Sequence, residues 1–248
     1  MDKILEVKNV YLTYHTPNDE ILAVKDLSFT VNKGEFVSII GPSGCGKTTI
    51  LSMIAGLIKP SSGSITLCGR NDRQNLGYML QKDHLFPWRT IEKNVLLPLE
   101  IKKSINRENV SYVRELLDKY GLKKFKNNYP EQLSGGMRQR AALIRTLSFR
   151  PDLLLLDEPF SALDSQTRLS VSDDVYKILK TEEKTAILVT HDISEAIAMS
   201  DVILVLTERP ATVRTIIRPN ILENSPIEKR KSKNFGALFD KIWKELHV

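Results

Sequence analysis

The chain has 248 residues, of which 42% are hydrophobic and 27% charged, a balance typical of globular proteins that rules out a disordered chain. Two cysteines, Cys45 and Cys68, are too few for a disulfide framework, so we expect a reducing compartment. No apolar run approaches the ~20 residues of a membrane-spanning helix, so any membrane role requires a partner, and the net charge of +6 alone does not separate nucleic acid, membrane surface and phosphate ligands.

The first part of the chain is predicted to form strands. Residues 4–14 and 27–31 alternate polar with apolar and β-branched side chains, and a turn-forming segment at 16–19 separates them. We expect these strands to pair as an antiparallel hairpin at an edge of the fold. A short apolar strand over 36–40 ends in a glycine-rich loop, and a helix over 47–57 should follow.

Helical patterns dominate the middle of the chain. After one more strand over 64–68, the segment from about 85 to 150 turns helical and is predicted to be a subdomain inserted into the fold. One of its helices should cover 110–120, where apolar residues recur at helical spacing and Gly121 is a suitable C-terminal cap.

Strands and helices alternate in the remainder of the chain, which predicts a mainly parallel sheet covered by helices. In order, we expect a strand at 153–157, a helix at 166–180, a strand at 186–190, a helix at 192–199 and a strand at 202–206. Residues 1–217 should therefore form one α/β domain, and residues 218–248 a surface connector with a short amphipathic helix over 238–246.

Residues 41–48 read GPSGCGKT and match the phosphate-loop pattern G-x-x-x-x-G-K-[ST] between the predicted strand and helix. Three glycines let backbone N–H groups curl around a phosphate, next to the partial positive charge of the helix N-terminus: Gly41, Gly44 and Gly46. Lys47 supplies a point charge to the β- and γ-phosphate oxygens, and the Thr48 hydroxyl is a Mg²⁺ ligand. A chance match in a turn is the alternative, which this context disfavours, so we predict nucleotide binding.

Cys45 lies inside this loop and has two interpretations. The favoured one is a small filler that faces the helix. The alternative is a reactive thiol, because a helix N-terminus lowers the pKa of a cysteine and leaves some thiolate near neutral pH. On that expectation alkylation of Cys45 blocks nucleotide binding, and Cys68, on a strand away from the loop, is the control.

Two carboxylates follow the four-leucine run at 153–156. Such a run is typical of a strand buried on both faces, and Asp157 and Glu158 then emerge at its carboxyl end, where α/β sheets bind ligands. Asp157 would hold Mg²⁺ through its water shell, and Glu158 would act as the general base that polarises the attacking water. A solvated pair of helix-capping acids is the alternative.

Residues 133–137 read LSGGM, close to the LSGGQ signature of ABC ATPases, and the sequence resembles this family over nearly its whole length. An ordered set of motifs carries the resemblance and is far more specific than any one of them alone. In chain order they are Tyr14 at the position of the adenine-stacking aromatic, the Walker A loop at 41–48, Gln81 at the Q-loop position, the signature, Walker B at 153–159, the D-loop SALD at 161–164 and the switch histidine His191.

The resemblance implies a P-loop NTPase core with an antiparallel β edge subdomain and an inserted α-helical subdomain, and it implies ATP and Mg²⁺ as cofactors. Catalytic roles are implied for Glu158, His191 and Gln81, and Mg²⁺ ligation for Thr48, Gln81 and Asp157. Contacts with ATP are implied for Tyr14, Gly41, Pro42, Ser43, Gly44, Cys45, Gly46, Lys47, Thr48, Thr49, Ser134, Gly135 and Gly136. Taken alone, each of the single residues has a structural alternative: packing for Tyr14, a surface position for Gln81 and a structural histidine for His191.

The resemblance also implies a head-to-tail homodimer with two ATP sites. The segment Ser134–Gly136 opens a predicted helix, so its N–H groups can cap a γ-phosphate held by the partner subunit. Met137 departs from the Gln of the family pattern, which puts any contact of that amide in doubt.

Two classes of ABC protein are alternatives here: a transport subunit, and a soluble ATPase that acts on nucleic acid or ribosomes. The segment between Thr48 and Leu133 is too short for the long coiled coils of DNA-repair members, and the chain carries one ATPase domain without a basic–aromatic stacking platform. These features favour transport and no nucleic-acid partner. The basic run at 229–231 is expected to be solvated, with contact to anionic lipid headgroups as the alternative.

The segment 84–101 resembles importer ATPases of the nitrate, sulfonate, taurine and thiamine-precursor group. In that group this surface binds the permease, and exposed Phe86, Pro87 and Trp88 suit a protein contact, whereas packing of Trp88 inside the helical subdomain is the alternative. The resemblance implies a peripheral position on the cytoplasmic face of the cell membrane, transmembrane permease subunits and, indirectly, an extracytoplasmic solute-binding protein. A small anionic or nitrogen- or sulfur-containing solute is expected, and its identity is not encoded in these motifs.

Overall fold

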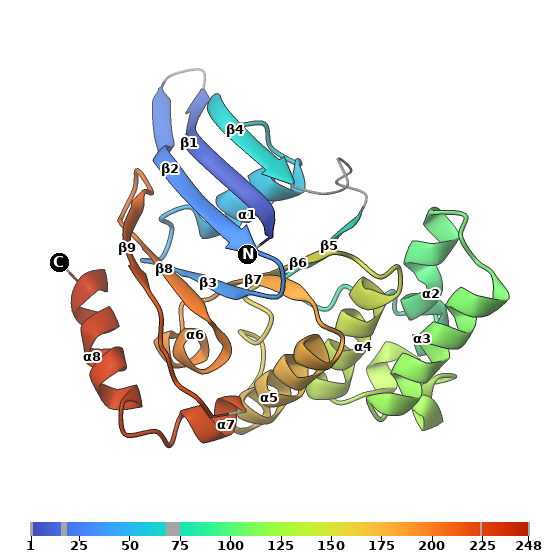
Figure 1. Cartoon of the computed structure of the whole chain (residues 1–248). Helices are drawn as coiled ribbons and strands as arrows, with labels where there is room; N and C mark the ends of the chain where they lie inside the picture. Colours follow the sequence, from blue (N-terminus) through green and yellow to red (C-terminus); the bar gives the residue numbers. More distant parts are fainter. Residues whose placement is uncertain (1, 16–18, 68–74, 224, 248) are drawn as a thin grey trace.

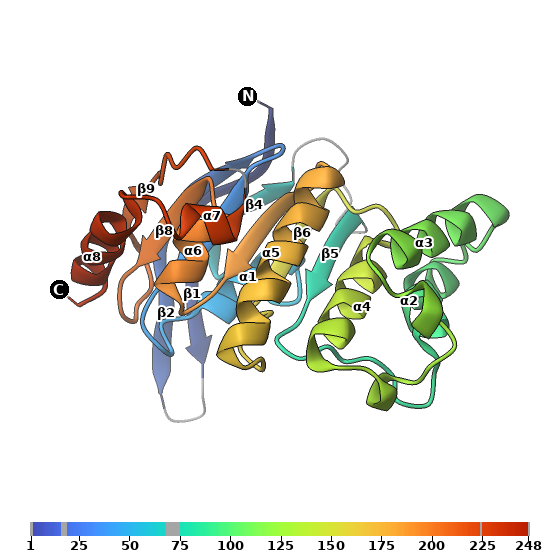
Figure 2. The same cartoon turned by 90° about the horizontal axis from the view of Figure 1, so that it is seen from below.

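A computed structural model describes residues 2–15, 19–67, 75–223 and 225–247. Two sheets and the helices around them form the fold (Figure 1). A three-stranded antiparallel sheet has the order β2-β1-β4, and a six-stranded sheet has the order β5-β6-β7-β3-β8-β9. The helical subdomain lies at one end of the central sheet, and the C-terminal helix lies at the other (Figure 2).

The edge sheet contains β1 (Lys3–His15), β2 (Glu20–Asn32) and β4 (Ser62–Leu67). The predicted antiparallel hairpin is confirmed, and its pairing runs as far as His15 opposite Glu20, so the second strand begins earlier than expected. Most of the predicted turn, residues 16–18, lies outside the described residues, as does Cys68.

The central sheet contains β3 (Phe36–Ile40), β5 (Leu76–Met79), β6 (Leu153–Asp157), β7 (Thr185–Val189), β8 (Val202–Leu206) and β9 (Val213–Ile217). Adjacent strands are parallel except β8 and β9, which confirms the mainly parallel sheet. Every residue of β3, β6, β7 and β8 is buried, because both faces of the sheet are covered. The strands β5 and β9 were not among the elements expected from the sequence.

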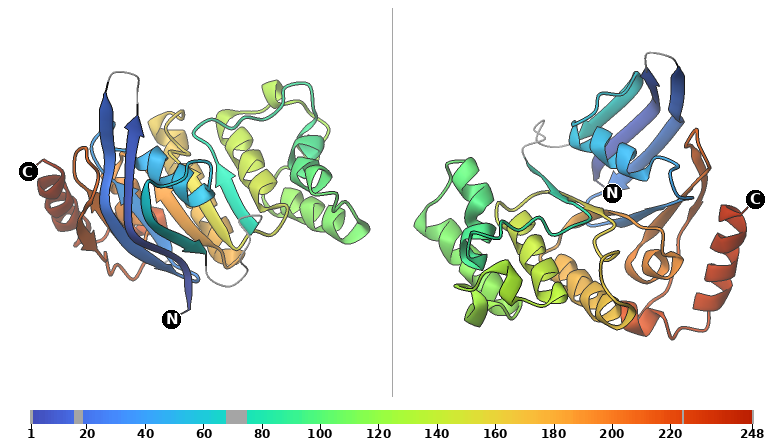
Figure 3. Two further views of the ribbon diagram at one scale, coloured as in Figure 1. Left: turned by 90° about the horizontal axis from the view of Figure 1, so that it is seen from above. Right: turned by 180° about the vertical axis from the view of Figure 1, so that it is seen from behind.

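The leucine run of β6 shows how the two faces are filled. Leu153 and Leu155 pack into a core with α1 (Lys47–Ala55) and the edge sheet, whereas Leu154 and Leu156 face α4 (Gly135–Leu147) and α5 (Ser165–Thr181). The light-blue helix α1 accordingly lies between the two sheets (Figure 3). This helix ends before the predicted Leu57, because Gly56 adopts a left-handed conformation with φ 76° and caps it.

The inserted helical subdomain is confirmed. It contains α2 (Ile91–Ile101), α3 (Arg107–Lys119) and α4, with short 3-10 turns at Lys123–Phe125 and Pro130–Gln132. The side chain of Asn106 caps the start of α3, and Gly121 follows its end with φ 75°, as expected. Apolar side chains of α2, α3 and α4 join the core beneath the central sheet, so the subdomain is packed onto the α/β unit.

The described residues after β7 also contain the helices α6 (Ile193–Met199), α7 (Pro226–Lys229) and α8 (Phe235–Leu246). The amphipathic helix expected at 238–246 begins earlier, at Phe235, and its Ile242 is fully buried in a third core cluster with α6 and β8. Within the described ranges, no helix combines the length and apolar character required to span a membrane.

A substitution at Gly63 of β4 can test how closely this strand approaches β1. Gly63 has φ 84°, and a Cβ at this position would lie 2.2 Å from the carbonyl oxygen of Asn9, whereas Gly34 has φ 80° with no atom within 4 Å of such a Cβ. We expect Gly63→Ala to lower the free energy of unfolding by about 3 kcal/mol, because overlap adds to left-handed strain, and Gly34→Ala to lower it by about 1 kcal/mol. Urea unfolding measures both losses, and equal losses would contradict this geometry.

Two glutamates carry pKa shifts of opposite sign. Burial raises the pKa of Glu195, even though Thr190 Oγ1 donates to Glu195 Oε2 at 2.6 Å. Burial also acts to raise the pKa of Glu182, but hydrogen bonds from Lys119 and Tyr120 outweigh it and leave this pKa lowered. Ionised Glu195 therefore costs stability above its folded pKa, whereas ionised Glu182 contributes stability above the unfolded pKa.

The two glutamates should respond oppositely to neutralisation. We expect Glu195→Gln to raise the melting temperature at pH 7 to 8, with a gain that shrinks as pH falls toward 4.5. Glu182→Gln should lower the melting temperature at pH 7, with a loss that shrinks as pH falls below 4.5. Calorimetric melts across this pH range measure both effects, and shifts of the same sign in the two variants would refute the assignment.

Candidate functional site

The phosphate-loop motif connects β3, in the middle of the central sheet, to α1. Gly44 and Gly46 adopt φ values of 73° and 117°, which suit glycine, and the backbone of Gly46 begins the helix. Gly41 is tightly enclosed, because a Cβ there would lie 2.9 Å from Cys45 Sγ. The Lys47 ammonium donates to the carbonyl oxygens of Gly41 at 2.8 Å and Pro42 at 2.9 Å, so the lysine lies inside the loop.

A cavity of about 580 Å³ opens beside this loop. It is lined by residues from the loop, α1 and the ends of three other segments: Ser43, Gly44, Gly46, Lys47, Thr48, Thr49, Glu158, His191 and Arg209. The exposed ring of Tyr14 lies near this region, since its hydroxyl donates to Thr49 Oγ1 at 3.4 Å. Most predicted phosphate-loop residues and two predicted catalytic residues therefore share one cavity.

Asp157 ends β6 next to the loop. Thr48 Oγ1 donates to Asp157 Oδ1 at 3.1 Å, and the Tyr78 hydroxyl donates to Asp157 Oδ2 at 3.3 Å. Burial raises the pKa of Asp157, and burial beside this carboxylate raises the pKa of Tyr78 to about 12. The phenol therefore acts as a donor at neutral pH, a partner of Asp157 that the sequence did not identify.

Glu158 lies at the centre of a small hydrogen-bonded group. Its Oε2 accepts from Gln81 Nε2 at 3.2 Å and is 3.3 Å from His191 Nδ1, while Gln81 Nε2 also lies 3.2 Å from Ser161 Oγ. Glu158 has φ 44°, and its N–H donates to the carbonyl of Val189 at 2.9 Å. The fold therefore brings the predicted catalytic side chains of Gln81 and His191 into contact with that of Glu158.

The residue types around Thr48 fit Mg²⁺. Two oxygen groups, the Thr48 hydroxyl and the Asp157 carboxylate, lie together beside the loop. The third predicted ligand, Gln81, contacts Glu158 and Ser161 instead and does not line the cavity. No cluster of three or more His, Cys, Asp or Glu side chains suited to a metal occurs among the described residues. The hydroxyl and carboxylate oxygens of Thr48 and Asp157 are ligand types that suit a cation also held by substrate phosphates.

The signature residues lie elsewhere in the subunit. Ser134 caps α4, and its Oγ accepts from the Met137 N–H at 3.3 Å. Added Cβ atoms at Gly135 and Gly136 would lie 3.1 Å from Leu163 and 2.8 Å from Val171, so both glycines pack closely on the D-loop and α5. None of these signature residues lines the cavity at the phosphate loop. One subunit alone therefore does not unite the two predicted ATP-contacting segments.

Cys45 corrects one expectation. The predicted low thiol pKa is wrong, because burial raises the pKa of Cys45 against the lowering effect of the positive charges of Lys47 and Arg209. The side chain is 2% exposed and belongs to the core with α1. The filler interpretation is confirmed, and the predicted ready alkylation near neutral pH has no support.

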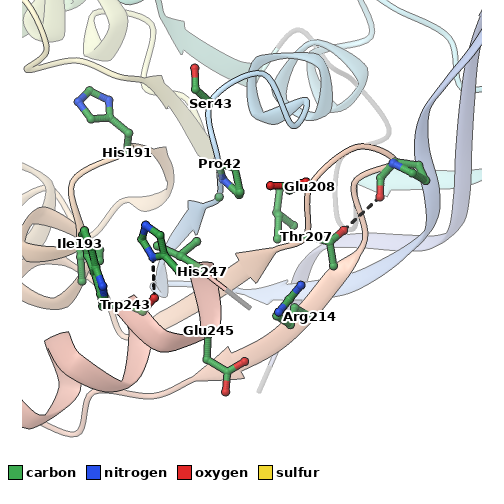
Figure 4. Close-up of a pocket in the computed structure, with 14 residues that line it drawn as sticks. Pro42, Ser43, His191, Ile193, Thr207, Glu208, Arg214, Trp243, Glu245 and His247 are labelled. Atoms are coloured by element: carbon green, nitrogen blue, oxygen red, sulfur yellow. Dashed lines mark hydrogen bonds between the residues drawn. The ribbon is translucent and has the colours of Figure 1, made fainter.

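A second cavity, of about 810 Å³, adjoins the first one at Ser43 and His191. Figure 4 shows its lining, with Pro42 and Ser43 of the loop and with Trp243 and His247 of the C-terminal helix. The rings of Trp243 and His247 stack with centroids 4.1 Å apart. The sequence assigned nothing to these residues, since no local motif relates α8 to a loop so far away along the chain.

Comparison with known proteins identifies the family. The family model described as ABC transporter matches residues 24–161. The chain is 51% identical to the "Uncharacterized ABC transporter ATP-binding protein YtlC" of Bacillus subtilis, over 98% of this chain and 95% of that protein. It is 42% identical to the taurine import ATP-binding protein TauB of Pelagibacter ubique, over 83% of this chain and 79% of that protein.

Solved structures agree with the fold. The dimeric structure of the ATP-binding cassette MJ0796 in a post-hydrolysis state, bound to ADP and Pi, matches with a TM-score of 0.73 and 32% identity, over 88% of this chain and 99% of that chain. The named relatives are transporter subunits, which favours transport over the alternative of a soluble ATPase for nucleic acid or ribosomes. The chain therefore belongs to the family of ABC transporter ATP-binding subunits and is an ABC ATPase.

Proposed function

We propose that this protein hydrolyses ATP at the cavity beside residues 41–48 and that the reaction powers an ABC importer. The position of the Glu158 carboxylate carries the proposal, because its Oε2 lies 3.2 Å from Gln81 Nε2 and 3.3 Å from His191 Nδ1. A phosphate loop alone supports binding only. A carboxylate held at its mouth by an amide and an imidazole supplies the groups that water needs for attack on a phosphate.

In the proposed reaction, Glu158 accepts a proton from water as the water oxygen bonds to the γ-phosphorus. The bond from that phosphorus to the oxygen bridging the β-phosphate breaks, and ADP and phosphate result. Lys47 and the loop N–H groups stabilise the charge on the phosphate oxygens, while His191 and Gln81 orient the carboxylate and the water. Thr48, Asp157 and Gln81 would hold Mg²⁺, which when bound supplies further positive charge to these oxygens.

A homodimer completes the proposed site. The signature residues Ser134, Gly135 and Gly136 lie away from the cavity of their own subunit, at the N-terminus of α4, where N–H groups can bind a phosphate. The resemblance to a dimeric cassette supports an arrangement in which each signature serves the ATP of the other subunit. Tyr14 would stack on the adenine at the edge of the same site.

The partner surface is proposed to be the loop before α2. Trp88 is 72% exposed and its ring lies 5.1 Å from that of Phe86, so the alternative of a packed Trp88 is wrong. Buried Asn94 fixes this loop: it accepts from the Phe86 N–H at 2.7 Å and donates to the Arg89 carbonyl at 2.9 Å. A rigid, exposed aromatic pair is suited to a permease, which would place the protein on the cytoplasmic face of the membrane.

The solute class follows from the relatives. Those named for a substrate import nitrate, taurine, aliphatic sulfonates or bicarbonate. We infer a small anionic or nitrogen- or sulfur-containing solute, delivered to the permease by a solute-binding protein outside the membrane.

Two substitutions test the hydrolysis site. Glu158→Gln should keep ATP binding, because the amide preserves the shape, and should reduce turnover at least about a hundredfold by removing the base. Lys47→Ala should lose most ATP binding as well as turnover. Equilibrium binding of a fluorescent ATP analogue and phosphate release measure both, and gel filtration with ATP should show a stable Glu158→Gln dimer. Wild-type turnover in Glu158→Gln would exclude the proposed base.

The partner surface has a separate test. Trp88→Ala should leave ATP binding by the isolated subunit unchanged and should weaken assembly with the permease by about 2 kcal/mol or more, because exposed aromatic residues dominate interface energies. Trp243→Ala on α8 is the matched control, since that side chain is also exposed, at 51%. Co-purification with the permease measures assembly, and equal retention of the two variants would exclude Trp88 as a contact.

A further inference from the structure

Arg209 is a cation at the ATP cavity that belongs to none of the motifs in the sequence. It follows β8, far along the chain from residues 41–48, yet its guanidinium donates to the carbonyl oxygen of Gly44 at 2.9 Å. It lines the same cavity as Lys47 and Thr48. The side chain is exposed, so its charge is available on the cavity side of the loop.

The backbone that carries Arg209 is held on two sides. Within the turn between β8 and β9, the Thr207 hydroxyl donates to the Pro210 carbonyl at 3.1 Å (the dashed line at Thr207 in Figure 4). The Thr212 N–H donates to that hydroxyl at 3.0 Å. On the other side, the Ala211 N–H donates to the Ala23 carbonyl of β2 at 2.9 Å. The turn thus joins both sheets, and Arg209 projects from a fixed frame.

The Arg209 side chain has N–H donors that are not used in its bond to Gly44 and can bind a ligand. A guanidinium carries five N–H donors in a planar fork, so a bond to one carbonyl leaves donors for the oxygens of a phosphate. Lys47, by contrast, is 7% exposed and already donates to two loop carbonyls. Among the described residues that line the cavity, Lys47 and Arg209 are the lysine and arginine side chains and Glu158 is the carboxylate, so Arg209 makes the cavity net positive.

We propose that Arg209 is a further nucleotide-binding residue, which holds the phosphate loop at Gly44 and donates to phosphate oxygens of bound ATP. The inference rests on the proposed ATP site. The ligand chemistry is a nucleoside di- or triphosphate, since the guanidinium bonds Gly44 of the phosphate loop and lines the same cavity as Lys47 and Thr48. The loop carbonyl and the ligand oxygens would share one planar donor group, so loop geometry and phosphate recognition depend on the same residue.

Binding measurements on the full chain test this. Arg209→Gln should weaken fluorescent MgATP about tenfold in low salt, because a charge-assisted hydrogen bond is lost, and should leave AMP unchanged. The loss should shrink in about 0.5 M salt, where charges are screened over a few ångströms. Arg218→Gln, which removes an exposed guanidinium at the other end of the same hairpin, is the matched control. Arg209→Lys should recover part of the affinity.

A purely structural role predicts a different result. Equal weakening of ATP and AMP by Arg209→Gln, with no dependence on salt, would overturn the phosphate contact. If that variant does not fold, phenylglyoxal modification of the wild-type protein decides the question, with peptide mapping: MgATP should slow modification of Arg209 at least about fivefold relative to Arg218, and adenosine should not. Equal modification with and without MgATP would refute the proposal. Absence of ATP binding by the wild-type chain would instead refute the proposed function itself.

Discussion

Burial of the central strands on both faces is the constraint on which the site depends. Since β3, β6 and β7 have no exposed face, charged side chains are found at or just after their ends and not within them. The three strands are neighbours and parallel, so their carboxyl ends meet at one edge. The phosphate loop, Asp157 and His191 emerge there together. Burial of the apolar strands thereby brings together polar groups that would be separate and hydrated in an unfolded chain.

Glu158 shows that this edge is shaped for more than stability. A non-glycine residue with φ 44° is disfavoured by about 1–2 kcal/mol, and such positions persist where the surroundings impose them. Here the N–H of Glu158 donates to Val189 and its carbonyl accepts from Ser161 Oγ at 2.9 Å, so backbone contacts hold the strained residue from both sides. The strain turns the carboxylate from the β6 strand toward Gln81 and His191, where it can serve a reaction.

The sequence predicted those parts of the fold in which local pattern and tertiary environment agree. The apolar run of β6 was delimited correctly, because its four leucines form an uninterrupted apolar segment that ends at Asp157. The half-exposed strand β9 could not be recognised in this way, because its polar and apolar residues alternate over only five positions. Asn94 and Arg209 were missed for another reason: each acts through backbone carbonyls, which carry no sequence signature. Cys45 was misjudged in pKa because the helix N-terminus is visible in sequence, whereas desolvation depends on packing.

The contacts of the D-loop bear on how two sites in the proposed dimer could communicate. The Ser161 hydroxyl accepts from Gln81 Nε2 and donates to the Glu158 carbonyl, so Ser161 is bonded to two residues of the group around Glu158. A few residues on, Leu163 lies against Gly135 of the signature, where even a Cβ would approach it to 3.1 Å. The residues around Glu158 are therefore connected to the signature of the same subunit by one short, tightly packed segment. In the proposed dimer, where the signature binds the nucleotide of the partner, this segment lies between the phosphate site of its own subunit and the phosphate contact made to the other.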